Sequence, residues 1–268
     1  MLFQTFEVIF LFMQLIWIVL QLIVSAFLLI KMFKTRQFNL LPLILFFIIN
    51  SVRMVVYAFT SFIILYLIMI QVPNILLLIF IQVTFFRNKK SPFKFFLITL
   101  IIVRSIDLCI RLQYGITIPM RYPLDESYLI FYYYILFSIT LSFLFSHMWL
   151  GIISIKYYKS LESIKIESWI KKRYQIIGIA SIIYGSSIFL YYLIPYNFVP
   201  GPDFLSVLLV AFITSFTIFY SSCMLIAWIM PPRLKAYFNR DYQVLSEKEY
   251  EENELLELIK EELKKNSY

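Results

Sequence analysis

The sequence predicts an all-α polytopic membrane protein: a bundle of seven transmembrane helices with its N-terminus outside and its C-terminus in the cytoplasm. Three observations predict this fold. The 268-residue chain is 61% hydrophobic and 15% charged, whereas a soluble domain is about half apolar and about a quarter charged. The apolar residues form long runs of the length that crosses a bilayer, about 20 residues. The basic residues lie in the short connections between those runs.

The predicted spans follow one another along residues 1–232, the transmembrane domain. The first apolar run, 8–30, has no basic residue before it and no small-residue cleavage site, so we interpret it as a retained helix rather than a signal peptide. Residues 38–86 hold a single charge, Arg53. As a helix they would be about 73 Å long, which suits two crossings of a ~30 Å hydrocarbon core with a break near residues 60–61. The predicted spans are 8–30, 40–59, 62–86, 95–118, 127–155, 174–194 and 204–230.

The lysines and arginines are distributed unevenly between the connections. The first, third and fifth connections and residues 233–240 after the last span hold sixteen of them. The N-terminus and the other connections hold one, Arg121. Because basic loops stay in the cytoplasm, this asymmetry predicts the orientation and places the chain in the cell membrane. If the charged fourth segment did not cross the membrane, every later connection would lie on the opposite side, and the basic fifth connection would face outside. The fourth segment is therefore predicted to cross the membrane too.

Residues 233–268 are predicted to form a cytoplasmic tail. Residues 233–238 follow two prolines and would lie along the inner membrane surface, with their apolar side chains in the interface. A capping-box pattern, Ser246 and Glu249, then opens a short amphipathic acidic helix. This helix either folds against the basic connections or a partner, or serves as a solubilising tail.

The fourth span carries three charges, Arg104, Asp107 and Arg111. Their spacing of i, i+3 and i+7 places all three on one helix face. On insertion scales the trio costs about 8–10 kcal/mol, which some fourteen apolar neighbours offset by only about 4–8 kcal/mol. This helix alone is therefore marginal in lipid, and its charged face is predicted to point into the bundle.

The trio has one excess positive charge, and Arg53 on the second span adds another. Arg53 and Arg111 fall in the outer half of their spans, near the acids at the outer span ends: Glu7, Asp125, Glu126 and Asp203. We therefore predict an outward-facing basic pocket for a small, anionic ligand. The candidate ligand-binding residues are Asn50, Arg53, Tyr57, Arg104, Asp107 and Arg111. The alternatives are an internal salt-bridge network that fixes helix register and, less favoured, simple snorkelling of the arginines.

Several classes of function are not expected from this sequence. Gly-rich phosphate loops, G-x-S-x-G and H-E-x-x-H are missing, so no enzyme is predicted. One histidine and two cysteines are too few for a membrane metal centre, and no cofactor is expected. The net charge of +8 is explained by topology, with the lipid bilayer rather than nucleic acid as partner. For His147 a packed, hydrogen-bonded side chain is favoured over a proton sensor.

The end of the last span, residues 227–238 with the sequence AWIMPPRLKAYF, resembles the end of the seven-helix sensor modules that precede histidine kinases in some archaea and bacteria. The resemblance covers these twelve residues and the number of spans. It implies a stand-alone sensor or receptor-like protein that would signal to a cytoplasmic partner through residues 87–94, 156–173 and the tail. The acidic-Arg-Tyr and N-P-x-x-Y motifs of the large eukaryotic receptor family are absent, as is a lysine for retinal in the last span. The alternative is a small-solute transporter of three-plus-one-plus-three helices.

Overall fold

A computed structural model describes residues 2–58, 63–87, 89–114, 129–162, 166–193 and 204–240. Every regular element in these ranges is a helix, so the prediction of an all-α fold is confirmed. Three predicted features lie outside the described residues: the break near 60–61, the outer span ends within 115–128 and 194–203, and the acidic helix of the tail.

The first half of the chain forms five α-helices. They are α1 (Leu2–Thr35), α2 (Leu41–Ala58) after a short 3₁₀ turn (Phe38–Leu40), α3 (Ile63–Met69), α4 (Val72–Phe85) and α5 (Phe93–Tyr114). α1 ends where Arg36 adopts a left-handed φ of 54°, a common way for a helix to stop. α5 begins where the Ser91 hydroxyl accepts a hydrogen bond from the Phe93 N–H, at 3.4 Å. This cap satisfies one of the donors that a helix leaves open at its first turn.

In the second half, α6 (Leu129–Phe143) and α7 (Trp149–Glu162) are joined without interruption by a π-helical turn (Leu144–Met148). α8 (Ser168–Ser187) continues as a 3₁₀ helix over Ile188–Leu193, and α9 spans Phe204–Ile229. α9 ends because Met230 adopts a left-handed φ of 41° and Pro231 cannot continue the helix. The short helix α10 (Pro232–Asn239) then starts with proline in its first turn and covers residues 233–238, whose place along the membrane surface stays a prediction.

Six segments are long and apolar enough to cross a membrane. They are Leu11–Thr35, Phe38–Val56, Ile64–Phe85, Leu129–Leu161, Ser168–Leu193 and Ala211–Ile229. This count covers the described residues only, and it confirms a helical protein embedded in a membrane. α5 is not among the six; it carries the three charges Arg104, Asp107 and Arg111 along its 22 residues.

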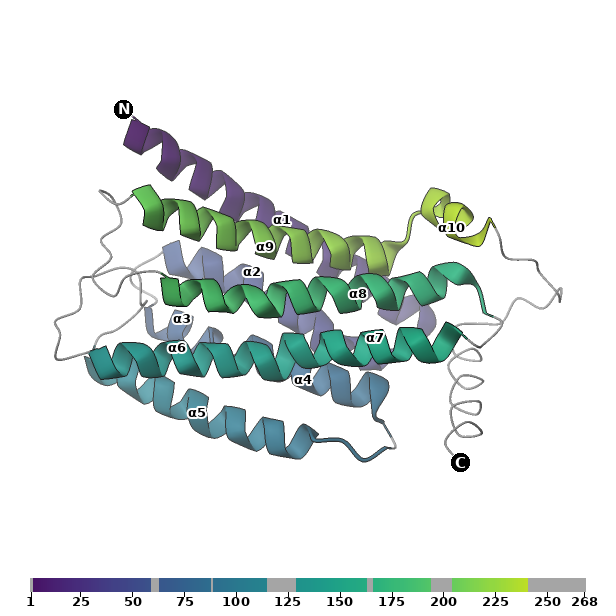
Figure 1. Cartoon of the computed structure of the whole chain (residues 1–268), viewed down its shortest axis with the longest axis horizontal. Coiled ribbons are helices and arrows are strands. Elements are labelled where there is room, and N and C mark those ends of the chain that lie inside the picture. Colours follow the sequence, from purple (N-terminus) through teal and green to yellow (C-terminus); the bar gives the residue numbers. More distant parts are fainter. Residues whose placement is uncertain are drawn as a thin grey trace.

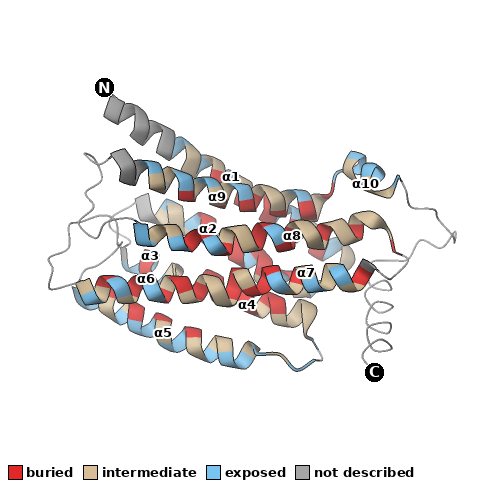
Figure 2. Cartoon of the chain, in the orientation of Figure 1, coloured by how far each residue is buried: buried red, intermediate tan, exposed pale blue. Residues whose placement is uncertain are grey.

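The helices pack into a closed bundle in which neighbours along the chain lie side by side (Figure 1). α1 contacts α2 and α9, α2 contacts α4, α5 contacts α4 and α6, and α8 joins α7 to α9. Buried residues collect on the faces between helices, while the outer faces are exposed (Figure 2). Large apolar side chains dominate that exposed surface, for example Phe12, Phe95 and Ile130. An apolar exterior is what a lipid environment requires.

α7 and α8 pack tightly where two glycines, Gly151 and Gly178, face each other. A Cβ atom on Gly178 would lie 2.7 Å from the side chain of Ile155 and 3.2 Å from the Gly151 carbonyl oxygen. The chain has only five glycines. Small residues let membrane helices pack backbone to backbone, and here they hold α7 against α8.

Candidate functional site

The three charges of α5 form one buried ion cluster. Arg104 Nη1 lies 3.2 Å from Asp107 Oδ2, and Arg111 Nε lies 2.9 Å from Asp107 Oδ1. Each arginine thus takes one oxygen of the same carboxylate. Arg104 is 4% exposed, Asp107 0% and Arg111 1%. The predicted common face is therefore real, and Asp107 is the internal partner of both arginines.

The opposite face of α5 is apolar and exposed. Ile98, Ile102 and Leu112 are each at least half exposed, whereas Arg104, Asp107 and Arg111 are among the four residues that the helix buries. This is the reverse of a water-soluble amphipathic helix, which buries its apolar stripe. It is the arrangement expected of a charged helix whose outer face meets lipid.

The charges of α5 meet a break in the neighbouring helix. α3 ends at Met69 and α4 begins at Val72, because Pro73 has no N–H with which to continue the helical hydrogen bonding. Arg104 Nη2 donates to the Ile70 carbonyl oxygen at 3.0 Å, and Gln71 Nε2 donates to Asp107 Oδ2 at 3.3 Å. The charged helix thus supplies partners to the backbone and side chain at the break, which lipid cannot do.

A third segment completes the arrangement. On α6, the Ser138 hydroxyl is within 3.5 Å of Arg104 Nη1, and the Tyr134 hydroxyl donates to the Val103 carbonyl oxygen at 3.2 Å. Ser138 is fully buried. We call Ile70, Gln71, Arg104, Asp107, Arg111 and Ser138 the α5 charge cluster. It ties α5 to the α3–α4 break on one side and to α6 on the other.

Arg53 is placed differently from the arginines of the cluster. It projects from α2 with its guanidinium 5.9 Å from the centre of the Trp17 ring. Its Nε is buried and has no hydrogen-bond partner, and no described carboxylate forms a salt bridge with it. It nevertheless lies close enough to Arg104 for the two like charges to interact. The described part of the chain therefore gathers three positive charges here against the single negative charge of Asp107.

The remaining predicted site residues are only partly placed. Asn50 is buried three residues before Arg53 on α2. The side chains of Tyr57 and Glu7, and the other acids expected to balance the charge, Asp125, Glu126 and Asp203, lie outside what the structure describes. The structure thus brings the α5 trio together beside Arg53, while binding of a ligand there stays a prediction.

Sequence reasoning missed the partners on other helices. Ile70 contributes only a backbone carbonyl, and Ser138 is one of many serines in the apolar runs. Pro73 was the available signal, since a proline inside a span frees a carbonyl about one turn earlier. A proline predicts a kink, but it does not predict which side chain will donate a hydrogen bond to the freed carbonyl.

His147 forms a second buried centre on the π-helical turn between α6 and α7. Its ring contacts those of Phe46, Phe143, Tyr184 and Tyr220, at centroid distances of 4.7–5.7 Å. The expected packing is confirmed, whereas Nδ1 is buried without a hydrogen-bond partner in the described structure. In the same described ranges, no group of three His, Cys, Asp or Glu side chains is placed to hold a metal ion.

No protein-family profile, curated protein or solved structure matches the chain. The fold and the site therefore define its class by themselves: a multi-pass helical membrane protein with a buried charge cluster at a broken helix.

Proposed function

We propose that the protein is a stand-alone receptor-like sensor of seven transmembrane helices, which binds a small anionic ligand in the outer half of the bundle. α5 would be the seventh span. Its 22 residues extend for about 33 Å, enough for a hydrocarbon core of about 30 Å. Its charges face protein and its isoleucines face outward, so the cost that made it marginal alone is offset by partners within the bundle.

The proposed orientation rests on the basic connections. The end of α1, the ends of α4 and α7, the starts of α5 and α8, and α10 all lie at one end of the bundle (Figure 1). That end carries the predicted cytoplasmic lysines and arginines. The N-terminus would then be outside, in the cell membrane. Arg53, twelve residues into α2 from that basic end, would lie in the outer half.

The observation that carries the ligand proposal is the unsatisfied Nε of Arg53. Arg53 is half-buried, and a buried guanidinium nitrogen without a hydrogen-bond partner is costly. The planar fork of the arginine side chain suits a carboxylate or phosphate. Arg104 and Arg111 form salt bridges with Asp107, so they would attract an anion through their positive charge rather than contact it directly. Binding an anion beside Arg53 would neutralise the excess positive charge of this region.

The output of such a sensor would leave at the basic end. Lys156 and Lys159 are exposed on α7, which at this end extends toward the predicted cytoplasmic connection. Residues 87–94, 156–173 and the acidic tail would present the surface for a cytoplasmic partner. The resemblance of residues 227–238 to the sensor modules that precede histidine kinases supports the same assignment.

The proposal can be tested by thermal denaturation of the purified protein with acetate, succinate, citrate or inorganic phosphate at constant ionic strength. At least one anion should raise the melting temperature of the wild type and of the control variant Arg87→Gln. Arg87 is an exposed arginine just after the end of α4, at the basic end of the bundle. The same anion should have no effect on Arg53→Gln, and Arg53→Lys should recover part of the shift. If Arg53→Gln responds to every anion as the wild type does, the ligand proposal is wrong.

A second candidate, an anion transporter of three-plus-one-plus-three helices, is favoured by one observation. The break between α3 and α4 presents the Ile70 carbonyl to a charged residue inside the bundle, and transporters use such broken helices at their substrate sites. Uptake of the stabilising anion into proteoliposomes separates the two functions. A sensor binds the anion without accumulating it, whereas accumulation that Arg53→Gln abolishes would replace the sensor proposal with the transporter.

A further inference from the structure

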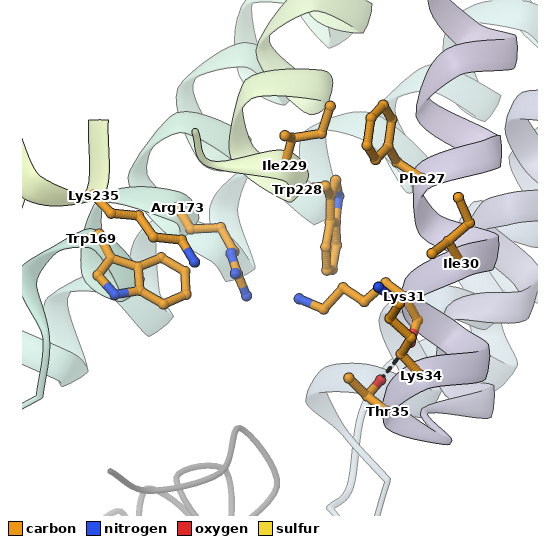
Figure 3. Close-up of a pocket in the computed structure, with 10 residues that line it drawn as sticks. All are labelled: Phe27, Ile30, Lys31, Lys34, Thr35, Trp169, Arg173, Trp228, Ile229 and Lys235. Carbon is orange, nitrogen blue, oxygen red and sulfur yellow. Dashed lines mark hydrogen bonds between the residues drawn. The ribbon is translucent and has the colours of Figure 1, made fainter. Parts of the chain in front are cut away.

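A pocket of about 660 Å³ opens at the basic end of the bundle. Figure 3 shows the side chains that line it. Four elements line it: the end of α1, the start of α8, the end of α9 and α10. The residues that matter are four cations and two tryptophans, namely Lys31, Lys34, Arg173, Lys235, Trp169 and Trp228. Among the described residues that line the pocket, none is acidic. Its charge therefore favours an anion.

The tryptophan rings hold the cations around the pocket. Lys235 Nζ lies 4.3 Å and the Arg173 guanidinium 4.7 Å from the centre of the Trp169 ring. On the other wall, Lys31 Nζ lies 5.5 Å and Arg173 5.6 Å from the centre of the Trp228 ring. Cation–π contacts of this kind stabilise like charges near one another without neutralising them.

The nearest acid along the chain, Glu167, is not among the described residues that line the pocket. Glu167 accepts a hydrogen bond from Asn239 Nδ2 at 2.9 Å and another from Trp169 Nε1. The Asn239 Oδ1 atom in turn accepts from the Trp169 backbone N–H at 3.2 Å. These bonds fasten α10 to the start of α8, which positions Lys235 over the pocket.

The pocket is also continuous with the apolar exterior. Phe27 and Ile30 of α1 line it, yet they are 46% and 52% exposed on the lipid-facing surface. A soluble anion would have no use for this apolar side. A phospholipid would use both parts, because its phosphate is anionic and its acyl chains are apolar. Tryptophan at the boundary between headgroups and hydrocarbon is typical of membrane proteins.

We propose that this pocket binds an anionic phospholipid of the leaflet at the basic end. The phosphate lies between Lys31, Lys34, Arg173 and Lys235, and an acyl chain runs along Phe27 and Ile30. The proposal is independent of any ligand at Arg53. Because α10 and the ends of α1, α8 and α9 all contribute, the bound lipid would fasten these four elements together.

The test compares two matched pairs of lysines in the full-length protein in neutral detergent. Lys34→Gln/Lys235→Gln removes two charges from the pocket, and Lys156→Gln/Lys159→Gln removes two exposed charges of α7 at the same end of the bundle. Binding of dioctanoyl phosphatidylglycerol is measured by native mass spectrometry and by thermal shift. Dioctanoyl phosphatidylcholine and inorganic phosphate serve as the other ligands, at equal ionic strength.

We expect phosphatidylglycerol to bind the wild type and the Lys156/Lys159 control alike. The pocket variant should bind it roughly 25-fold more weakly, at about 1 kcal/mol per lysine and 1.4 kcal/mol per tenfold in affinity. Its melting temperature without lipid should match that of the control, which excludes a folding defect.

Four results would overturn the proposal. Equal binding of phosphatidylcholine, or an equal loss in the control variant, would leave only general attraction to the basic surface. Inorganic phosphate that binds as well as the lipid would indicate a soluble-anion site. Finally, the acidic tail can be tested as the occupant with a peptide of residues 241–268 and a chain that ends at Arg240. If this chain binds the peptide but not phosphatidylglycerol, and Lys34→Gln/Lys235→Gln abolishes the binding of the peptide, the pocket belongs to the acidic tail.

Discussion

Replacing Asp107 with asparagine should destabilise the protein more than removing the whole ion cluster from α5. Asn keeps the shape of the side chain and a hydrogen-bond acceptor but removes the negative charge. Arg104 and Arg111 are then left buried, at 4% and 1% exposure, without the carboxylate that they contact at 3.2 and 2.9 Å. Each contact corresponds to about 5–6 kcal/mol of gross attraction at an effective dielectric constant of 20.

Most of that attraction only offsets the cost of burying three charges, so the net effect is smaller. Removing one partner of a buried ion pair typically costs about 3–5 kcal/mol. For a chain of this size that corresponds to a fall in melting temperature of roughly 6–20 °C. The measurement is thermal denaturation of the purified protein in detergent.

The variant with Leu at 104, 107 and 111 is the informative comparison. It removes the charges together with their desolvation cost, so the sequence alone predicts that it is well tolerated. The structure adds a cost, because Arg104 also donates to the Ile70 carbonyl oxygen, and an unsatisfied carbonyl costs about 1–3 kcal/mol. The expected order of melting temperature is wild type, then triple Leu, then Asp107→Asn. An Asp107→Asn protein that melts with the wild type would refute this account of the cluster.

Three further predictions concern orientation and packing. A cysteine at Asp125 should react with an impermeant thiol reagent in intact cells, and one at Lys90 should not, in a chain whose native cysteines are replaced by alanine. His147→Phe should change stability by less than about 1.5 kcal/mol, because the aromatic packing is kept and a buried Nδ1 without a partner is removed, whereas His147→Ala should cost about 2–5 kcal/mol. Gly178→Ala should cost about 1–3 kcal/mol, because its Cβ would meet Ile155 at 2.7 Å.

Each of these three predictions has a control or a result that would contradict it. Labelling at Lys90 but not at Asp125 would reverse the orientation and move Arg53 to the inner half. A large loss in His147→Phe would mean that the imidazole makes a polar contact essential to the fold. Ser186→Ala, an exposed change on α8, controls for Gly178→Ala in the same melting measurement. Equal melting temperatures for the two would show that α7 and α8 separate easily.

The sequence predicts the helices well because each span is a local pattern. The run 62–86 matches α3 and α4, and the i, i+3, i+7 spacing correctly places Arg104, Asp107 and Arg111 on one face. The break at Ile70 falls a few residues before Pro73, as the missing proline N–H dictates. These features depend on neighbours within one or two helical turns.

The partners across helices could not be predicted, because they depend on how the spans pack. Ile70 and Ser138 meet Arg104 from positions 34 residues away on either side along the chain. The π-helical turn at Leu144–Met148 has no proline or glycine to announce it. The basic pocket was also missed, since its lysines were explained fully by topology. Trp169 and Trp228 were the only hints that these charges converge.

The helix break at Ile70 and Gln71 also bears on how the chain is assembled during synthesis. Gln71 is made 36 residues before Asp107, a delay of about 2–7 s at ribosomal speed. During that interval the break lacks its donor from Arg104, and α5, when it emerges, is the segment least able to enter lipid unaided. We therefore expect α4 and α5 to leave the insertion machinery as a pair. α5 supplies the hydrogen-bond donor for the helix break, and the break supplies partners for the charges of α5. A mutation in the cluster would then show first as a failure of biogenesis, before any loss of stability in the finished protein.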